Sequence, residues 1–240
     1  MDIEQQKIHD FQNNQLSLDD TFKFHCKGCG KCCKNRDDLL LTPRDLYNIA
    51  KHLGRTTEQI IKRYCEFFIG ESSRVTLVQL KPVDLDNRCP LLYDNRCIVH
   101  KAKPTICALY PLGRGYSTSD GRSFETIDPV YFIQNVNCGE KTQTQTVRSW
   151  LEKFGVPIND EFHYLWAITV MRLSEFCIKF EKENKKDLVN KLNMVIFSLL
   201  YLNYDTNINF LLQFIERAMA LNRISDSEDM TNILSEMPKV

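Results

Sequence analysis

The sequence predicts an α+β fold, in which a cysteine-rich, metal-organised module of short strands and loops packs with a mainly α-helical C-terminal half. Two observations carry this prediction. Nine of the ten cysteines fall between residues 26 and 138, and all of them except Cys65 lie among short β-branched stretches and loop-like sequence. From residue 147 onward, apolar side chains instead recur every three to four residues, which is typical of amphipathic helices. We therefore expect a polar N-terminal arm (1–20), a cysteine-cluster metal-binding module (21–140) and a helical C-terminal region (141–240).

The composition is that of a soluble globular chain, with 43% hydrophobic residues, 26% charged residues and a formal net charge of zero. A neutral chain gives no reason to propose binding to nucleic acid or to an acidic membrane surface. The longest apolar run, residues 194–202, is too short to span a bilayer. The first residues are acidic and amide side chains without the apolar segment of a secretory signal, so we expect a cytoplasmic protein.

The first cysteine run follows the polar arm and places four thiols within eight residues, at Cys26, Cys29, Cys32 and Cys33. A C-x2-C unit lets two sulfurs converge on one metal ion, and Gly28 and Gly30 can supply the positive φ that such turns need. The side chains of neighbouring residues diverge. The vicinal pair Cys32 and Cys33 therefore suggests two metals, or a cluster with more than one iron.

Basic residues flank these thiols, at Lys23, Lys27, Lys31, Lys34 and Arg36. Nearby positive charge lowers the pKa of a thiol and offsets the charge of a thiolate-metal centre, so we expect surroundings that suit thiolates. The alternative is a disulfide framework. A cytosolic chain of 240 residues does not need disulfides to stabilise its core, and there such a pattern more often indicates metal or redox chemistry.

Two helices are predicted after the first cysteine run. Thr42 and Pro43 begin the first helix, and Gly54 can end it as a C-terminal cap. A capping box at Thr56 begins the second helix, which we expect to continue through Phe68. Cys65 would lie on that helix beside apolar residues, and we interpret it as a core side chain outside the metal site.

A strand is predicted over residues 74–83, and it leads to a second group of thiols at Cys89, Cys97 and Cys107. Asp94 and Asn95 are typical of a tight turn, which would bring Cys89 and Cys97 to the same end of a hairpin. One or two further strands are expected between residues 124 and 136.

Cys138 follows in a turn-like sequence, and we count it as the eighth metal ligand, with an isolated loop thiol as the alternative. Eight thiols suffice for two four-thiolate centres, which need not coincide with the two groups in the sequence. His25 and His100 stand beside cysteines, and we interpret both as partly exposed polar residues rather than ligands.

These cysteine motifs resemble the bacterial CxxCxxCC family, whose members are described as zinc- or iron-chelating proteins. The matching motifs are Cys26-x2-Cys29-x2-Cys32-Cys33, Cys89-Pro90-Leu91, Cys97-Ile98, Lys103-Pro104-x2-Cys107 and Tyr110-Pro111. A similar cysteine region occurs in flagellin lysine methylases, so the resemblance also implies a link to protein modification. The chain departs from the family at Lys103 and Ala108, where arginine is usual, and lysine cannot reproduce a bidentate guanidinium contact.

The spacing of the cysteines leaves the identity of the metal open. Two structural zinc sites would use eight thiolates, and iron-sulfur clusters also use cysteine thiolates. The familiar ferredoxin run differs, because its fourth cysteine lies several residues beyond the third. The vicinal pair and the family resemblance favour an iron-sulfur cluster, with 4Fe-4S as the preferred type and zinc as the alternative.

The C-terminal region is predicted to contain four helices, over residues 147–154, 160–180, 188–202 and 208–221, and a short helix within residues 225–240. Cys177 belongs to the apolar stripe of the second of these helices, and we interpret it as a core residue. The helical half either forms an ordinary core or presents a face to a protein partner.

Three functional hypotheses follow. The first is an iron-sulfur protein with a redox, metal-handling or protein-modification role, and the second is a structural zinc module that supports a helical interaction domain. The third, which rests on the resemblance alone, is an enzyme related to flagellin lysine N-methylase. No other catalytic motif is present, since the sequence has no phosphate loop, no G-x-S-x-G and no H-E-x-x-H.

Overall fold

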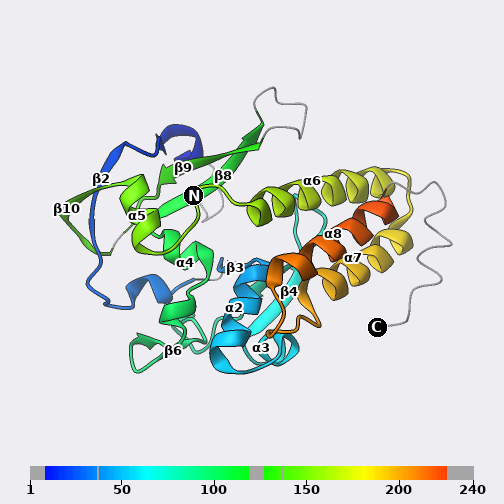
Figure 1. Ribbon diagram of the computed structural model, residues 1–240, viewed down its shortest axis with the longest axis horizontal. Coiled ribbons are helices and arrows are strands. Elements are labelled where there is room, and N and C mark those ends of the chain that lie inside the picture. Colours follow the sequence, from blue (N-terminus) through cyan, green and yellow to red (C-terminus); the bar gives the residue numbers. More distant parts are fainter. Residues whose placement is uncertain (1–8, 37, 119–126, 137, 226–240) are drawn as a thin grey trace. The chain divides into compact units, whose positions relative to one another are not determined.

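The computed structural model describes residues 9–36, 38–118, 127–136 and 138–225. The chain divides into two compact units, residues 1–39 with 80–160 and residues 40–79 with 161–240. Short antiparallel strands and helices occur together, and most of the long helices follow residue 160 (Figure 1). The predicted α+β class with a helical C-terminal half is confirmed.

Small antiparallel sheets form the frame of the first unit. Strand β9 (Ile127–Ile133) lies between β1 (Gln15–Leu16) and β8 (Leu112–Thr118), and β2 (Thr21–His25) pairs with β10 (Glu140–Thr146). Part of the predicted polar arm is therefore tied into a sheet. Asp10 in this arm is also buried, and it accepts a hydrogen bond from the backbone N–H of Asn135 at 3.1 Å.

Trp150 is at the centre of the core of the first unit. It lies on helix α5 (Val147–Lys153), and its ring packs against Phe22 and Phe24, two alternate residues of β2. Its indole N–H donates to the carbonyl of Leu109 at 3.0 Å, at the end of helix α4 (Thr105–Leu109). Since burial of aromatic rings supplies much of the hydrophobic free energy of a small core, this cluster positions β2 and α4, which both carry cysteine-bearing segments.

The second unit begins with the two predicted helices. Helix α2 (Pro43–Leu53) has a reciprocal capping box between Thr42 and Asp45, and Gly54 ends it in the left-handed conformation at φ 60°. Helix α3 (Thr57–Tyr64) also begins at its predicted capping box. It ends four residues earlier than predicted, because Cys65–Ile69 form strand β4 instead. The helical expectation for Cys65 was therefore wrong, and aromatic and β-branched residues in this stretch suit a strand.

Strand β4 belongs to a three-stranded sheet in the order β3-β5-β4, with β3 at Leu40–Leu41 and β5 at Thr76–Leu80. Strand β5 confirms the strand predicted over residues 74–83. The hydroxyl of Thr76 donates to the carbonyl of Asn193 at 3.1 Å, which fixes the central strand to helix α7 (Lys186–Tyr201).

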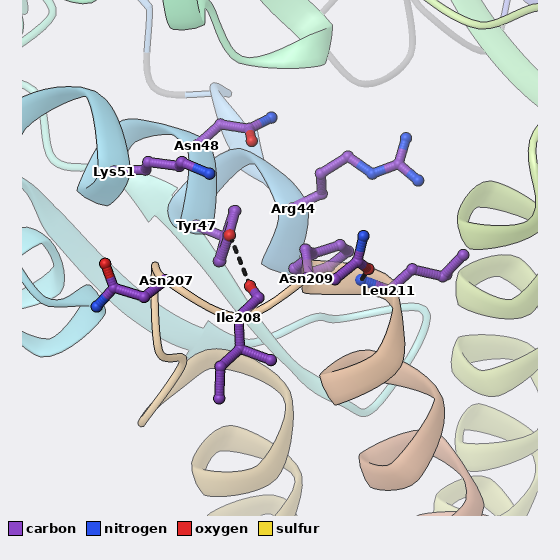
Figure 2. Close-up of a pocket in the computed structure, with 9 residues that line it drawn as sticks. Arg44, Tyr47, Asn48, Lys51, Asn207, Ile208, Asn209 and Leu211 are labelled. Atoms are coloured by element: carbon purple, nitrogen blue, oxygen red, sulfur yellow. Dashed lines mark hydrogen bonds between the residues drawn. The ribbon is translucent and has the colours of Figure 1, made fainter.

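Helices α6 (Glu161–Lys182), α7 and α8 (Phe210–Ser225) lie side by side in the second unit (Figure 1). Phe162 and Phe214 are fully buried between them with ring centroids 4.8 Å apart, and Cys177 is buried as predicted. The hydroxyl of Tyr47 donates to the carbonyl of Ile208 at 2.8 Å, which holds the loop before α8 on helix α2 (Figure 2). The helix predicted within residues 225–240 lies outside the described residues.

Within the part of the chain that the structure describes, no helix is both long and apolar enough to cross a bilayer.

Candidate metal centre

All eight cysteines that were predicted as ligands belong to the first unit, and Cys65 and Cys177, which were excluded, belong to the second. Six of the eight line one cavity of about 360 Å³, namely Cys26, Cys29, Cys32, Cys33, Cys97 and Cys138. The structure thus brings together thiols that are up to 112 residues apart in the sequence.

The first cysteine run is shaped by its glycines. Phe24 is buried at the end of β2, and beyond this strand Gly28 and Gly30 have φ values of 64° and 70°. Few side chains tolerate these angles, so the two glycines let the chain turn around the cavity, as predicted. A short 3-10 helix (Lys31–Cys33) follows Gly30 and carries the vicinal pair.

Backbone hydrogen bonds join the two cysteine groups. The N–H of Cys89 donates to the carbonyl of Cys33 at 2.7 Å, and the N–H of Asn35 donates to the carbonyl of Asp86 at 3.1 Å. The segment after the first run is thereby held beside the segment that precedes the second. Local sequence patterns cannot reveal this pairing, because its partners are about fifty residues apart.

The second cysteine group is positioned by a hairpin and a short helix. Strands β6 (Leu92–Tyr93) and β7 (Arg96–Cys97) pair antiparallel, and the turn residues Asp94 and Asn95 both have positive φ, as a tight hairpin turn requires. The predicted turn is confirmed. Cys107 lies on α4, whose last carbonyl is held by the indole N–H of Trp150, so core packing fixes the position of this thiol.

Cys138 is held against the same cavity. Its sulfur lies 3.1 Å from the Tyr110 hydroxyl oxygen. Gly139 has a φ of 75°, and a Cβ atom at this position would lie 2.3 Å from the ring of Phe24, so glycine is required for the close approach. The aromatic ring that packs against Trp150 therefore also supports the turn that presents Cys138.

Electrostatic interaction links every pair among four thiols, Cys32, Cys89, Cys97 and Cys107, and Cys32 also interacts with the neighbouring Cys33. Burial raises the pKa of Cys89 to about 11, and the nearby thiols Cys97 and Cys32 add to the shift. Burial likewise raises the pKa of Cys97 and Cys107. In the first run, the neighbouring thiol of Cys33 and burial raise the pKa of Cys32 and outweigh the positive charges of Lys103 and Arg36, so the predicted lowering by basic residues is wrong for Cys32.

Two cations accompany this group of thiols. Arg36 forms an ion pair with Asp38, in which one guanidinium N–H donates at 3.1 Å, and its guanidinium lies 5.9 Å from the centre of the Tyr110 ring. Burial alone would lower the pKa of Arg36, but Asp38 more than offsets this effect and raises it. Lys103 also faces the thiols, and its positive charge acts to lower the pKa of Cys97. The lysine that departs from the family pattern thus keeps a cation beside the cysteines.

Sequence reasoning counted Arg36 only among flanking charges and Tyr110 only as part of a motif. Arg36 is charge-paired and half-buried, and Tyr110 contacts both Arg36 and Cys138. The sequence feature that could have indicated the role of Arg36 is its position three residues after the vicinal cysteines. His100 lines the cavity, and the positive charge of Lys103 lowers its pKa, which favours neutral imidazole.

The chemistry of these donors fits a thiolate-bound metal centre, since thiolates are ligands for zinc and for iron-sulfur clusters and the adjacent cations offset their charge. The vicinal sulfurs of Cys32 and Cys33 lie 4.0 Å apart. Among the residues that the structure describes, no three His, Cys, Asp or Glu side chains already surround one point as the ligands of an ion do.

Comparison with known proteins gives a family match. The model of the CxxCxxCC domain, described as "Putative zinc- or iron-chelating domain", matches residues 25–146, about half of the chain. An uncharacterized protein of Methanocaldococcus jannaschii is 34% identical over 88 residues, which cover 37% of this chain and 44% of that protein. The chain therefore matches less than half of the length of this relative. No solved structure matches. Because the family model spans all eight candidate ligands, the chain belongs to the CxxCxxCC family of zinc- or iron-chelating domains.

Proposed function

We propose that this chain is a metal-binding protein whose eight clustered cysteines hold an iron-sulfur cluster, with 4Fe-4S as the preferred type, and that it serves a redox role. The observation that supports this proposal most is the cavity of about 360 Å³ lined by six thiols. One mononuclear ion needs little free space between its ligands, whereas a cluster of several iron and sulfide atoms needs a cavity. Cysteine thiolates are the usual ligands of such clusters.

In this proposal the eight thiols act as two groups of four. One group is Cys32, Cys89, Cys97 and Cys107, which interact in every pair and of which Cys32 and Cys97 line the cavity. The remaining four are Cys26, Cys29, Cys33 and Cys138, which all line the cavity. Both groups combine thiols from the two halves of the motif.

An iron-sulfur cluster supplies one-electron transfer when it is bound. The surrounding residues would stabilise the charge of the thiolates: Arg36 and Lys103 bring positive charge beside the four-thiol group. Tyr110 is placed to donate a hydrogen bond to the sulfur of Cys138. Hydrogen bonds to ligand sulfurs and nearby charge are the main means by which proteins adjust the potential of such centres.

A second candidate is a structural zinc site, and one distance favours it. Four sulfurs about 2.3 Å from a tetrahedral zinc ion are about 3.8 Å from one another. The separation of 4.0 Å between the sulfurs of Cys32 and Cys33 is close to that value. In this alternative the vicinal pair shares one ion, whereas the cluster proposal assigns its two members to different groups.

The test is the iron, zinc and acid-labile sulfide content of the full chain purified without oxygen, together with its visible spectrum. The proposal predicts iron with an equal amount of sulfide and a broad absorption band in the visible range. Zinc without sulfide or colour would contradict it and support the structural site. Protein that binds neither metal after anaerobic reconstitution would contradict both.

A further inference from the structure

The charge of the first unit is unevenly distributed along its chain. The unit is neutral overall, since it contains sixteen basic and sixteen acidic residues. The two cysteine-bearing segments, residues 21–38 and 84–107, hold nine of the basic residues but five of the acidic ones. The positive charge of this unit is therefore concentrated in the segments that carry most of its thiols.

Ion pairs use less than half of this positive charge. Four basic residues are paired, in Lys27–Glu140, Lys34–Asp86, Arg36–Asp38 and Arg88–Asp84. Five others form no ion pair with a described residue, namely Lys23, Lys31, Arg96, Lys101 and Lys103. Of the acidic residues that the structure describes in the two segments, Asp94 alone has no such pair. Positive charge thus remains in excess.

The excess charge lies around the cavity that holds the thiols. Arg96 and Lys103 line this cavity together with Cys26 and Cys29, and none of the described residues that line it is acidic. Cys26 and Cys29 are both exposed. Lys31 is exposed as well, and it stands between two residues of the cavity wall. A centre bound by these thiols would therefore be accessible from solvent at a positively charged opening.

An aromatic side chain lies beside this opening. Tyr93 is 71% exposed, and the pairing of β6 with β7 places it directly opposite Arg96, so the two side chains share one face of the hairpin. Ile98, which directly follows Cys97, is 39% exposed. Tyrosine and arginine are among the residues that contribute most to binding at protein interfaces. The opening thus combines charge with groups suited to contact another protein.

We propose that a basic face formed by Lys27, Lys31, Tyr93, Arg96 and Lys101 docks an acidic electron-carrier protein. This inference rests on the proposed redox function and names its partner. One electron passes from the reduced carrier to the oxidised cluster, so the carrier is oxidised as the cluster is reduced, and no bond forms or breaks. Complexes of redox proteins are small and transient, and complementary charge guides their encounter.

A nucleic acid is a different polyanion, and the charge pattern fits it less well. Asp94 lies in the hairpin turn between Tyr93 and Arg96, and the carboxylates of Asp86 and Glu140 lie beside Lys34 and Lys27. These carboxylates interrupt the positive charge and would repel a continuous row of phosphates. A folded acidic protein presents separate carboxylates, which can meet the basic residues individually.

The first test measures the field at the opening without the natural partner. The iron-loaded full chain is reduced and then oxidised by hexacyanoferrate(III), an anion, or by tris(phenanthroline)cobalt(III), a cation. The rate with the anion should fall as the ionic strength rises, and the rate with the cation should rise, because salt screens both attraction and repulsion. The opposite salt dependence would overturn the proposal.

Charge reversal locates the face. Lys31→Glu and Arg96→Glu should each lower the rate with hexacyanoferrate(III) severalfold at low salt. Lys62→Glu is the matched control, because it changes the net charge equally at an exposed position of α3 in the second unit. Equal rates in Arg96→Glu and Lys62→Glu at equal iron content would overturn the assignment of the face.

The second test measures docking by isothermal titration calorimetry, with an acidic flavodoxin as the probe and the basic cytochrome c for comparison. The flavodoxin should bind the iron-loaded chain, and Lys31→Glu combined with Arg96→Glu should weaken this binding at least about tenfold. Equal binding of both carriers, or tighter binding of single-stranded RNA than of flavodoxin, would overturn the proposal. A chain without iron and sulfide would overturn the proposed function as well, whereas a cluster-containing chain that is insensitive to probe charge would overturn the docking inference alone.

Discussion

The two units of this protein are stabilised by different interactions. In the second unit, long helices bury aromatic rings such as Phe162 and Phe214, and regular backbone hydrogen bonds account for most of its structure. In the first unit, the segments that carry cysteines form only short 3-10 turns, two-residue strands and a five-residue helix. The comparison indicates that the second unit is stabilised by its core, whereas the cysteine segments depend on what their thiols bind.

Removal of metal should produce the largest difference in stability between the two units. Treatment of the loaded protein with a strong chelator, or oxidative loss of a cluster, should lower amide protection in residues 26–36 and 86–107, because bound metal contributes much of the folding free energy of such segments. Amides of α6 and α8 should remain protected. Hydrogen exchange measured by mass spectrometry checks this, and equal loss of protection in both units would contradict the comparison.

A cavity in the helical core should have the converse effect. Phe214→Ala removes a fully buried ring and should lower the free energy of unfolding by about 3–5 kcal/mol. The metal content per chain should not change, because Phe214 belongs to the unit that holds none of the candidate ligands. Urea unfolding and metal analysis on the same samples check both parts. Leu212→Ala on the same helix is the control. Because Leu212 is exposed, this substitution should lower the unfolding free energy only slightly.

The stability of the metal-free chain should depend on pH through a buried thiol of the first unit. Burial raises the pKa of Cys89 from 9.0 to about 11 in the folded state, so the folded chain holds this proton more tightly than the unfolded chain. Its contribution to stability is fully present below pH 9.0 and is lost as the pH rises to about 11. Unfolding of the metal-free chain followed by circular dichroism should therefore show declining stability over this range. The decline should be smaller in Cys89→Ser, and an unchanged decline in that variant would argue against the assignment.

The smallest effect is expected at the hydroxyl of Tyr110. Tyr110→Phe keeps the aromatic ring but removes the hydrogen bond to Cys138, a loss of about 1 kcal/mol. The metal should be released faster to a competing chelator, while the thermal stability of α6–α8 should not change. Tyr131→Phe is the matched control in the same unit, because its hydroxyl donates to the carbonyl of Ile158 at 3.2 Å rather than to a thiol. Equal release rates from the two variants would show that the contact with Cys138 has no special role.

Features with local causes could be predicted from the sequence. The capping box at Thr42, the end of α2 at Gly54 and the turn at Asp94 and Asn95 all depend on residues within one or two turns of chain. Motif spacing and apolar stripes are also local signals, and they distinguished eight candidate ligands from Cys65 and Cys177. The structure places these two sets of cysteines in different units.

Features with distant causes could not be predicted. Strand β10 is polar throughout, and it is a strand because Gln145 and Thr146 pair with Phe22 and Thr21 in β2. The membership of residues 40–79 in the helical unit likewise depends on contacts such as that of Thr76 with Asn193. The raised pKa values of the thiols depend on burial, which the run of nearby lysines in the sequence does not reveal.

The central claim is that the thiols of the first unit bind the metal, and the most direct measurement is the metal content per chain of three proteins purified in parallel without oxygen. These are the wild-type chain, Cys97→Ser and Cys65→Ser. The account predicts that Cys97→Ser loses half or more of the bound metal, because one four-thiolate group is broken, while Cys65→Ser retains all of it. Equal metal content in Cys97→Ser and the wild-type chain, or loss of metal from Cys65→Ser alone, would contradict the account.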